Sequence, residues 1–163
     1  MVRLWVITRL LFLLTLANGT PVLAKKMFGN RLSRPLDRGA RCLDGQPFFG
    51  VSKTIRGILL SVLVTVVGAY LVGLGCKIGA LVGSVAMSGD LFSSFLKRRL
   101  RLTASSRAIG LDQIPESLFP LLACRSAFSL SVLDIAVAVF TFFVGEVLIS
   151  RVLYKFHLRD RPY

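Results

Sequence analysis

The stretch SGDLFSSFLKRR, residues 88–99, places a carboxylate inside an apolar run that ends in three consecutive cations. An acid within a membrane-length apolar segment is disfavoured by about 2.5 kcal/mol or more, so it is normally kept where it faces a cavity, an ion or a substrate. On a helix, Asp90, Ser94 and Lys97 would share one face. That face offers metal-binding oxygens and, about 10 Å further along the axis, cations suited to phosphate. The alternative is a plain membrane helix whose basic end marks the cytoplasm.

The composition is that of a membrane protein. Of 163 residues, 54% are hydrophobic, and 21 Lys and Arg stand against 8 Asp and Glu. The length fits one membrane-embedded domain covering residues 1–163. The uninterrupted apolar runs exclude a soluble nucleic-acid binder, so the cations are interpreted as determinants of topology and as phosphate ligands. The three cysteines and His157 lack metal-ligand spacing, which argues against a zinc site and a disulfide framework.

Hydropathy predicts an all-α integral membrane protein with about five transmembrane helices. The expected spans are residues 4–22, 58–75, 78–96, 117–124 and 128–149. The fourth apolar run is too short to cross a bilayer unless its flanks extend it or it is partly re-entrant. In the third span, Gly79 and Gly83 lie at near-helical spacing, which favours close packing against another helix over room for a ligand.

Two long basic loops are expected between the spans. Residues 25–57 carry eight cations, residues 97–111 carry five, and the tail from residue 150 carries four. The positive-inside bias places both loops and the tail in the cytoplasm and the N-terminus outside. The first span also looks like a signal peptide, with VLA before Lys25, but cleavage there would send eight cations outward. An uncleaved helix is therefore predicted.

The cytoplasmic face is expected to combine hard oxygen ligands with cations and hydroxyls. Magnesium prefers one or two carboxylates, keeps several waters and bridges phosphate oxygens. Asp90 and Asp112 beside lysines and arginines would therefore suffice for phosphoryl or nucleotidyl transfer. The expected phosphate donors are Ser52, Lys53, Thr54, Arg56, Lys97, Arg98 and Arg99. The SKT sequence lacks Walker spacing and is weak evidence by itself.

Four segments, in order along the chain, resemble the archaeal-type CDP-archaeol synthase family, which is related to the CDP-diacylglycerol synthases. They are NGTPVLAKK (18–26), PLDRGARCLDGQPFFGVSKTIRG (35–57), SGDLFSSFLKRR (88–99) and GLDQIPE (110–116). The elements SKTxxG, GDLxxSxxKR and an LDxxD-like motif are the family's shared core, and the tail VLYKFHLRDRPY resembles the family's ending. The GLDQIPE version and residues 120–125 are more similar to bacterial members.

The resemblance implies a nucleotidyltransferase that uses Mg²⁺ to transfer CMP from CTP to an archaetidic-acid-like lipid phosphate, releasing a CDP-lipid and pyrophosphate. It implies that Asp90 and Asp112 hold the metal. Lys53 and Lys97 are expected to act with these two aspartates in catalysis. The nucleotide and its phosphates are expected at Ser52, Lys53, Thr54, Lys97 and Arg98, and further contacts are expected at Asn18, Asp37, Arg41 and Asp44.

The loop residues among these have a simpler alternative. Asp37, Arg41 and Asp44 would either touch the nucleotide or order the first loop through an internal salt bridge. Asn18 and Thr20, at the inner end of the first span, would line the cleft. Asp134 and Glu146 lie toward the ends of the last span, where interfacial solvation suffices, and are left out of the expected site.

Two other functions remain open on the sequence. A phosphatidate cytidylyltransferase making CDP-diacylglycerol would use the same chemistry, because lipid tails are recognised by apolar grooves that no motif encodes. A small membrane transporter would use its acids as an ion path, and these acids would then face one another at mid-membrane.

Overall fold

The structure is a computed structural model that describes residues 3–29, 31, 33–102 and 110–155. Within these residues the chain forms helices and no named strand. The helices are α1 (Leu4–Phe28), α2 (Ile55–Leu71), α3 (Cys76–Arg99), α4 (Gln113–Ala123), α5 (Arg125–Phe128) and α6 (Val132–Lys155). The prediction of an all-α fold is confirmed. The expected cation Arg107 and the tail beyond residue 155 lie outside the described residues.

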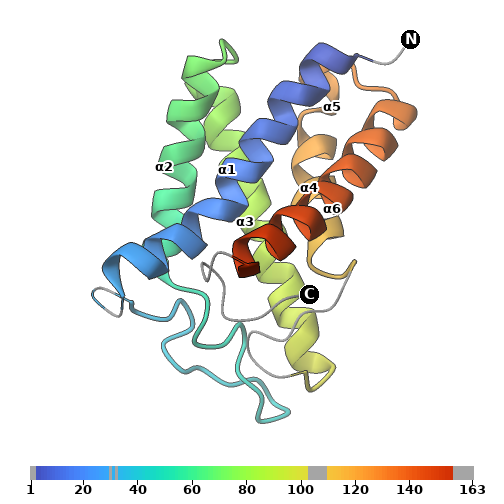
Figure 1. The fold of residues 1–163 in the computed structure, drawn as a ribbon. Coiled ribbons are helices and arrows are strands. Elements are labelled where there is room, and N and C mark those ends of the chain that lie inside the picture. The colour runs from blue at the N-terminus through green and yellow to red at the C-terminus, as the bar shows by residue number, and fades with distance from the viewer. Residues whose placement is uncertain (1–2, 30, 32, 103–109, 156–163) are drawn as a thin grey trace.

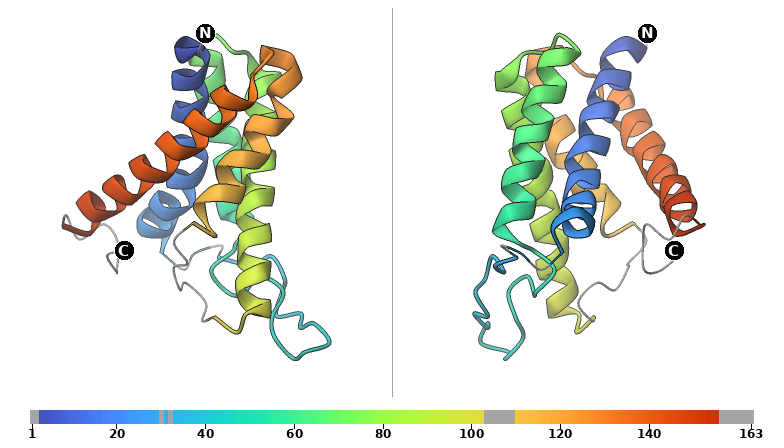
Figure 2. Two further views of the ribbon diagram at one scale, coloured as in Figure 1. Left: turned by 90° about the vertical axis from the view of Figure 1, so that its right-hand side faces the viewer. Right: turned by 60° about the vertical axis from the view of Figure 1, so that its left-hand side comes forward.

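The helices form one bundle with two distinct ends. Helices α1, α2 and α3 lie side by side, α4 runs along α3, and α6 leans across α1 and α4 (Figure 1). The start of α1, the turn between α2 and α3, and the short α5 lie at one end (Figure 2). The long loop before α2 and the basic end of α3 lie at the other, so the two predicted basic loops share one end of the bundle.

Three helices, α1, α3 and α6, are long and apolar enough to cross a membrane. Helix α2 is equally apolar but has 17 residues, and α4 has only 11. The membrane assignment is therefore supported, whereas five full spans are not established among the described residues. Helix α4 starts earlier than predicted, directly after Asp112, and the chain turns at Ser129, whose φ of 47° is left-handed, before α6 begins.

Glycines set the close packing of α2 against α3. A Cβ atom on Gly79 would lie 2.6 Å from Val66 Cα, and one on Gly83 would lie 3.1 Å from Val62 Cα. Neither distance leaves room for a side chain without moving a backbone. The expected use of these two glycines in helix packing is confirmed.

A proline and a serine fix the contact between α1 and α2. Pro21 lies inside α1 and has no N–H, so the carbonyl of Ala17 loses its usual partner four residues on. The buried hydroxyl of Ser61 in α2 donates to that carbonyl at 2.6 Å. The helix therefore continues through Pro21 to Phe28, six residues beyond the predicted end of the first span, with the freed acceptor satisfied by its neighbour.

Candidate active site

Lys53 and Asp90 meet where the first loop joins the bundle. The Lys53 ammonium lies 2.5 Å from both carboxylate oxygens of Asp90, which is in α3. Only 22% and 19% of the two side chains are exposed. Two hydrogen bonds from the loop hold this position, from Leu36 N to Lys53 O at 2.8 Å and from Lys53 N to Gly50 O at 3.2 Å. The structure thus brings together two residues that the sequence placed in separate motifs.

A second ion pair joins the end of α3 to the start of α4. The Lys97 ammonium lies 2.7 Å from Asp112 Oδ1, and the lysine side chain is 9% exposed. Asp112 directly precedes α4. Lys97 also acts electrostatically on Asp90, and Asp112 acts on Lys53, so the two pairs form one cluster. The four residues predicted to be catalytic therefore lie together.

Glu116 is a fifth member of this cluster that the sequence reasoning missed. It is buried in α4 and its carboxyl group is hydrogen-bonded to that of Asp90. Two carboxyl groups share a hydrogen bond only when one of them carries a proton. The available signal was the spacing, because Asp112 and Glu116 are separated by one helical turn and so face the same side.

The cluster keeps Lys53 charged. Burial lowers the pKa of the Lys53 ammonium, but the negative charge of Asp90 outweighs it, with further contributions from Glu116 and Asp112. The pKa is therefore raised above its ordinary value of 10.5. At neutral pH this ammonium is a fixed cation among acids.

Gly89 allows α4 to approach α3 beside this cluster. A Cβ atom at Gly89 would lie 2.4 Å from the carbonyl oxygen of Pro115 and 2.9 Å from the nitrogen of Glu116. Any side chain here would push Glu116 away from Asp90. The glycine before Asp90 in the GD sequence is therefore required by the contact between the helices.

The acids of the first loop bind loop backbone instead of the cluster. Asp37 accepts hydrogen bonds from the backbone nitrogens of Gly39, Phe49 and Gly50 at 3.2, 3.1 and 2.9 Å. Burial raises the pKa of Asp37, but these N–H groups outweigh burial and the pKa lies below its ordinary 3.8. Of the two roles considered for Asp37, ordering the loop is the one its contacts show.

Asp44 and Arg41 also order the loop. Asp44 forms an ion pair with Arg99 at the end of α3, and Arg99 donates to the carbonyl of Pro47 at 2.9 Å. The guanidinium of Arg41 donates to Gly45 O at 3.4 Å within the same loop. These contacts dock the loop tip onto α3.

The remaining predicted residues differ in burial and in the element that carries them. Ser52 is exposed beside Lys53, and the Thr54 hydroxyl caps α2 by accepting from Gly57 N at 3.1 Å. Arg98 is buried at 5% exposure. Asn18 lies in α1, away from the loop, and Thr20 donates to Leu16 O inside the same helix.

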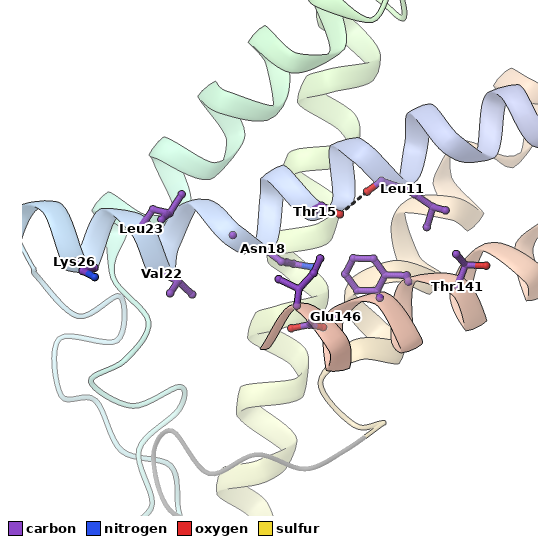
Figure 3. Close-up of a pocket in the computed structure, with 12 residues that line it drawn as sticks. Leu11, Thr15, Asn18, Val22, Leu23, Lys26, Thr141 and Glu146 are labelled. Carbon is purple, nitrogen blue, oxygen red and sulfur yellow. Dashed lines mark hydrogen bonds between the residues drawn. The ribbon is translucent and has the colours of Figure 1, made fainter. Parts of the chain in front are cut away.

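A groove of about 320 Å³ separates α1 from α6 near the cluster. Figure 3 shows Asn18 of α1 and Glu146 of α6 on its two sides. Most of its wall is apolar, and Lys26 lies at one end. The prediction that Asn18 lines a cleft agrees with this position, and Glu146, left out of the expected site, lines the same groove.

No group of three or more His, Cys, Asp or Glu side chains is arranged as a complete metal site in the part of the chain that the structure describes. The carboxylates near Lys53 instead sit in contact with ammonium groups. The arrangement provides two or three oxygen ligands and two adjacent cations in one largely buried place.

The sequence and the fold are similar to those of known proteins. The family model described as CarS-like CDP-archaeol synthase matches residues 3–163. A CDP-archaeol synthase of Sulfurisphaera tokodaii is 31% identical and covers 90% of this chain and 89% of its own length. A CDP-archaeol synthase of Thermococcus onnurineus is 35% identical, and the match covers 79% of this chain and 77% of that protein.

A solved structure of an intramembrane enzyme for archaeal membrane lipid biosynthesis has the same fold. Its TM-score is 0.70 at 24% sequence identity, and the match covers 84% of this chain and 90% of that one. The likeness shows that the helical bundle described above is a fold already seen in a solved structure. With the family model spanning nearly the whole sequence, the chain belongs to the CDP-archaeol synthase family of CTP-utilising lipid cytidylyltransferases.

Proposed function

We propose that the protein transfers CMP from CTP to an archaetidic-acid-like lipid phosphate in a magnesium-dependent reaction that releases pyrophosphate. A lipid phosphate oxygen forms a bond to the α-phosphorus of CTP, and the bond from that phosphorus to the bridging oxygen of pyrophosphate breaks. The lipid phosphate is already ionised near neutral pH, so no side-chain nucleophile is required. Positioning and charge stabilisation then supply the acceleration.

The observation that carries this proposal is the shared cluster of Lys53, Asp90, Lys97, Asp112 and Glu116. Phosphate groups need cations, and a nucleotide's metal ion needs hard oxygen ligands. Here both kinds of group converge on the second half of α3, between the first loop and α4. A transporter path of acids facing one another does not account for two lysines that pair with these acids.

The donor set fits magnesium. Asp90 and Glu116 share a hydrogen bond that needs a proton, and Lys53 contacts both oxygens of Asp90. The proton shared by Asp90 and Glu116 and the Lys53 ammonium thus neutralise carboxylate oxygens that a hard cation such as magnesium would otherwise neutralise. Asp90 and Asp112 would hold the ion, and when bound it would offset negative charge on the phosphates of CTP.

The chain's own groups then bind the phosphates. With the carboxylates neutralised, Lys53 and Lys97 are released from their ion pairs and can bind phosphate oxygens. Arg98 lies one residue further along α3, and Ser52 and Thr54 supply hydroxyl donors beside Lys53. The orientation proposed for this site is cytoplasmic, because the first loop carries eight cations.

The test uses purified protein in detergent with CTP and Mg²⁺. Archaetidic acid and phosphatidic acid are offered in parallel, and CDP-lipid and pyrophosphate are measured. We expect the ether lipid to give the faster product, and equal or faster use of the ester lipid would identify a phosphatidate cytidylyltransferase. Chelation of Mg²⁺ should stop turnover, and persistence of turnover in excess chelator would exclude the metal assignment.

A matched pair of variants tests the site itself. Asp90→Asn should reduce CDP-lipid formation by about 10²-fold or more, because it removes a charge from the cluster. Asp134→Asn is the control, because Asp134 caps α6 at the opposite end by accepting from Ser131 N at 2.9 Å. The control should lose some thermal stability and keep its turnover. Equal turnover in the two variants would contradict the proposal.

A further inference from the structure

We propose that the groove between α1 and α6 receives, from the bilayer, the apolar chain of the lipid substrate next to its phosphate, and that Gly19 and Gly145 keep this groove open. The inference rests on the proposed function, because it assigns the lipid end of the same reaction. The NGTPVLAKK segment (18–26) supplies part of the α1 side of this groove, whereas no sequence motif covers its α6 side.

The position of the groove gives it access to lipid. It lies between α1 and α6, two helices long and apolar enough to cross a membrane. Residues such as Leu11, Val22, Phe142 and Ile149 form its wall, which suits hydrocarbon. Its volume of about 320 Å³ is at the small end of ligand sites, so it holds part of one chain while the rest stays in the bilayer.

The groove also adjoins the reacting cluster. Glu146 lines the groove and interacts electrostatically with Glu116, which is hydrogen-bonded to Asp90. A chain lying in the groove would therefore have its phosphate end within reach of the lysines that pair with Asp90 and Asp112. The buried amide nitrogen of Asn18, on the wall opposite Glu146, has no hydrogen-bond partner among the described residues (Figure 3). It offers a donor for an oxygen of the lipid's glycerol or phosphate.

At two glycines in the groove wall, close packing does not exclude a larger side chain. A Cβ atom built on Gly19 or on Gly145 meets nothing within 4 Å, in contrast to Gly79, where a Cβ meets backbone at 2.6 Å. Glycine weakens a helix relative to alanine, and neither position has a positive φ that would require it. Both positions line the groove, one from α1 and one from α6, and without side chains they leave open space that a lipid chain would fill.

The experiment introduces a leucine side chain into the groove, either from α1 or from α6. Gly145→Leu and Gly19→Leu should raise KM for the lipid phosphate by roughly tenfold or more, because even a methylene changes discrimination in an apolar pocket on this scale. KM for CTP should not change. Ala136→Leu is the matched control, because it adds a similar side chain at an exposed position of α6 outside the groove. Gly145→Ala replaces Gly145→Leu if the larger side chain prevents folding.

Both archaetidic and phosphatidic acids are assayed, so the effect is assigned to isoprenoid chains, acyl chains or both. An unchanged KM for both lipids in both leucine variants would overturn the proposal. A lipid phosphate carrying a diazirine near its glycerol provides a readout that does not depend on turnover. Its crosslinks should map to residues 11–26 or 141–149, and crosslinks confined to α2 and α3 would overturn the groove. A wild-type protein that forms no CDP-lipid would refute the proposed function instead.

Discussion

The ammonium of Lys97, in the last turn of α3, lies 2.7 Å from Asp112, the residue directly before α4. This ion pair fixes where α4 begins relative to α3. Because Glu116 lies one turn further along α4, the same contact also places Glu116 beside Asp90. The geometry of the cluster therefore depends on a pair of residues at the edges of two helices.

The Lys97–Asp112 pair leads to the first prediction. Asp112→Asn should lower CDP-lipid formation by about 10²-fold or more while the protein stays folded, because the variant keeps the shape of the side chain and loses its charge. Turnover of radiolabelled CTP in detergent measures the effect, and size-exclusion chromatography checks folding. Near-normal CTP consumption by Asp112→Asn would show that this carboxylate has no role in the reaction.

A second prediction concerns the glycine beside Asp90. Gly89→Ala should reduce both activity and stability, the latter by about 1–3 kcal/mol, because the added Cβ meets the backbone of Pro115 at 2.4 Å. Gly79→Ala is the matched control on the same helix, where the Cβ meets α2 instead of α4. The control should lose stability but keep turnover per folded molecule. If the two variants have the same specific activity, the α3–α4 spacing does not control the site.

The third prediction is a pH dependence of the first loop. The pKa of Asp37 is depressed below 3.8 in the folded protein, so its contribution to loop stability is present above pH 3.8 and is lost as pH falls through the folded value. Hydrogen exchange of the peptide holding Phe49 and Gly50, corrected for intrinsic rates, should show protection at pH 5 that disappears at lower pH.

Asp37→Asn is the control for this measurement. It removes the titrating group, so it should show less protection at pH 5 and a flatter pH profile. The difference between wild type and variant separates Asp37 from Asp44, which titrates in the same loop. Identical profiles would show that Asp37 does not hold the loop.

The fourth prediction tests orientation with two native cysteines at opposite ends of the bundle. Cys42 lies in the first loop, and the exposed Cys76 starts α3 at the far end. If the loops are cytoplasmic, a membrane-impermeant maleimide added to intact cells should label Cys76 and spare Cys42. Cys76→Ser should abolish labelling, and Cys42→Ser should not change it. Labelling of Cys42 in intact cells would reverse the proposed topology.

The sequence was sufficient to predict the helical membrane fold and four of the five cluster residues, namely Lys53, Asp90, Lys97 and Asp112. Apolar runs and the GDLxxSxxKR spacing act locally, so they place Asp90 and Lys97 on one helix without knowledge of the fold. These local patterns do not predict which lysine pairs with which acid. Lys53 pairs with Asp90 and Lys97 with Asp112 only because the first loop docks on α3 and α4 starts beside it.

Local sequence patterns also failed to predict the roles of the loop acids, the start of α4 and the position of Glu116. Asp37 and Asp44 carry charges that suit a nucleotide equally well, and only their contacts show that they hold the loop. The fourth apolar run was predicted at residues 117–124, whereas α4 begins at Gln113. Its first turn was missed because the polar residues there do not continue the apolar run. Glu116 was missed because a lone acid near a helix start is usually solvated.

The hydrogen bond from Ser61 to the Ala17 carbonyl affects how α1 is aligned along α2. Pro21 leaves this carbonyl without its usual partner within α1. Between apolar helices in lipid, hydrocarbon contacts alone give little preference for one sliding position over another. Moving α1 along α2 by one turn, about 5.4 Å, would strand that carbonyl in a dry environment. This polar contact therefore helps to fix the position along the bundle of Asn18, the next residue in the chain, relative to Lys53, which lies two residues before α2.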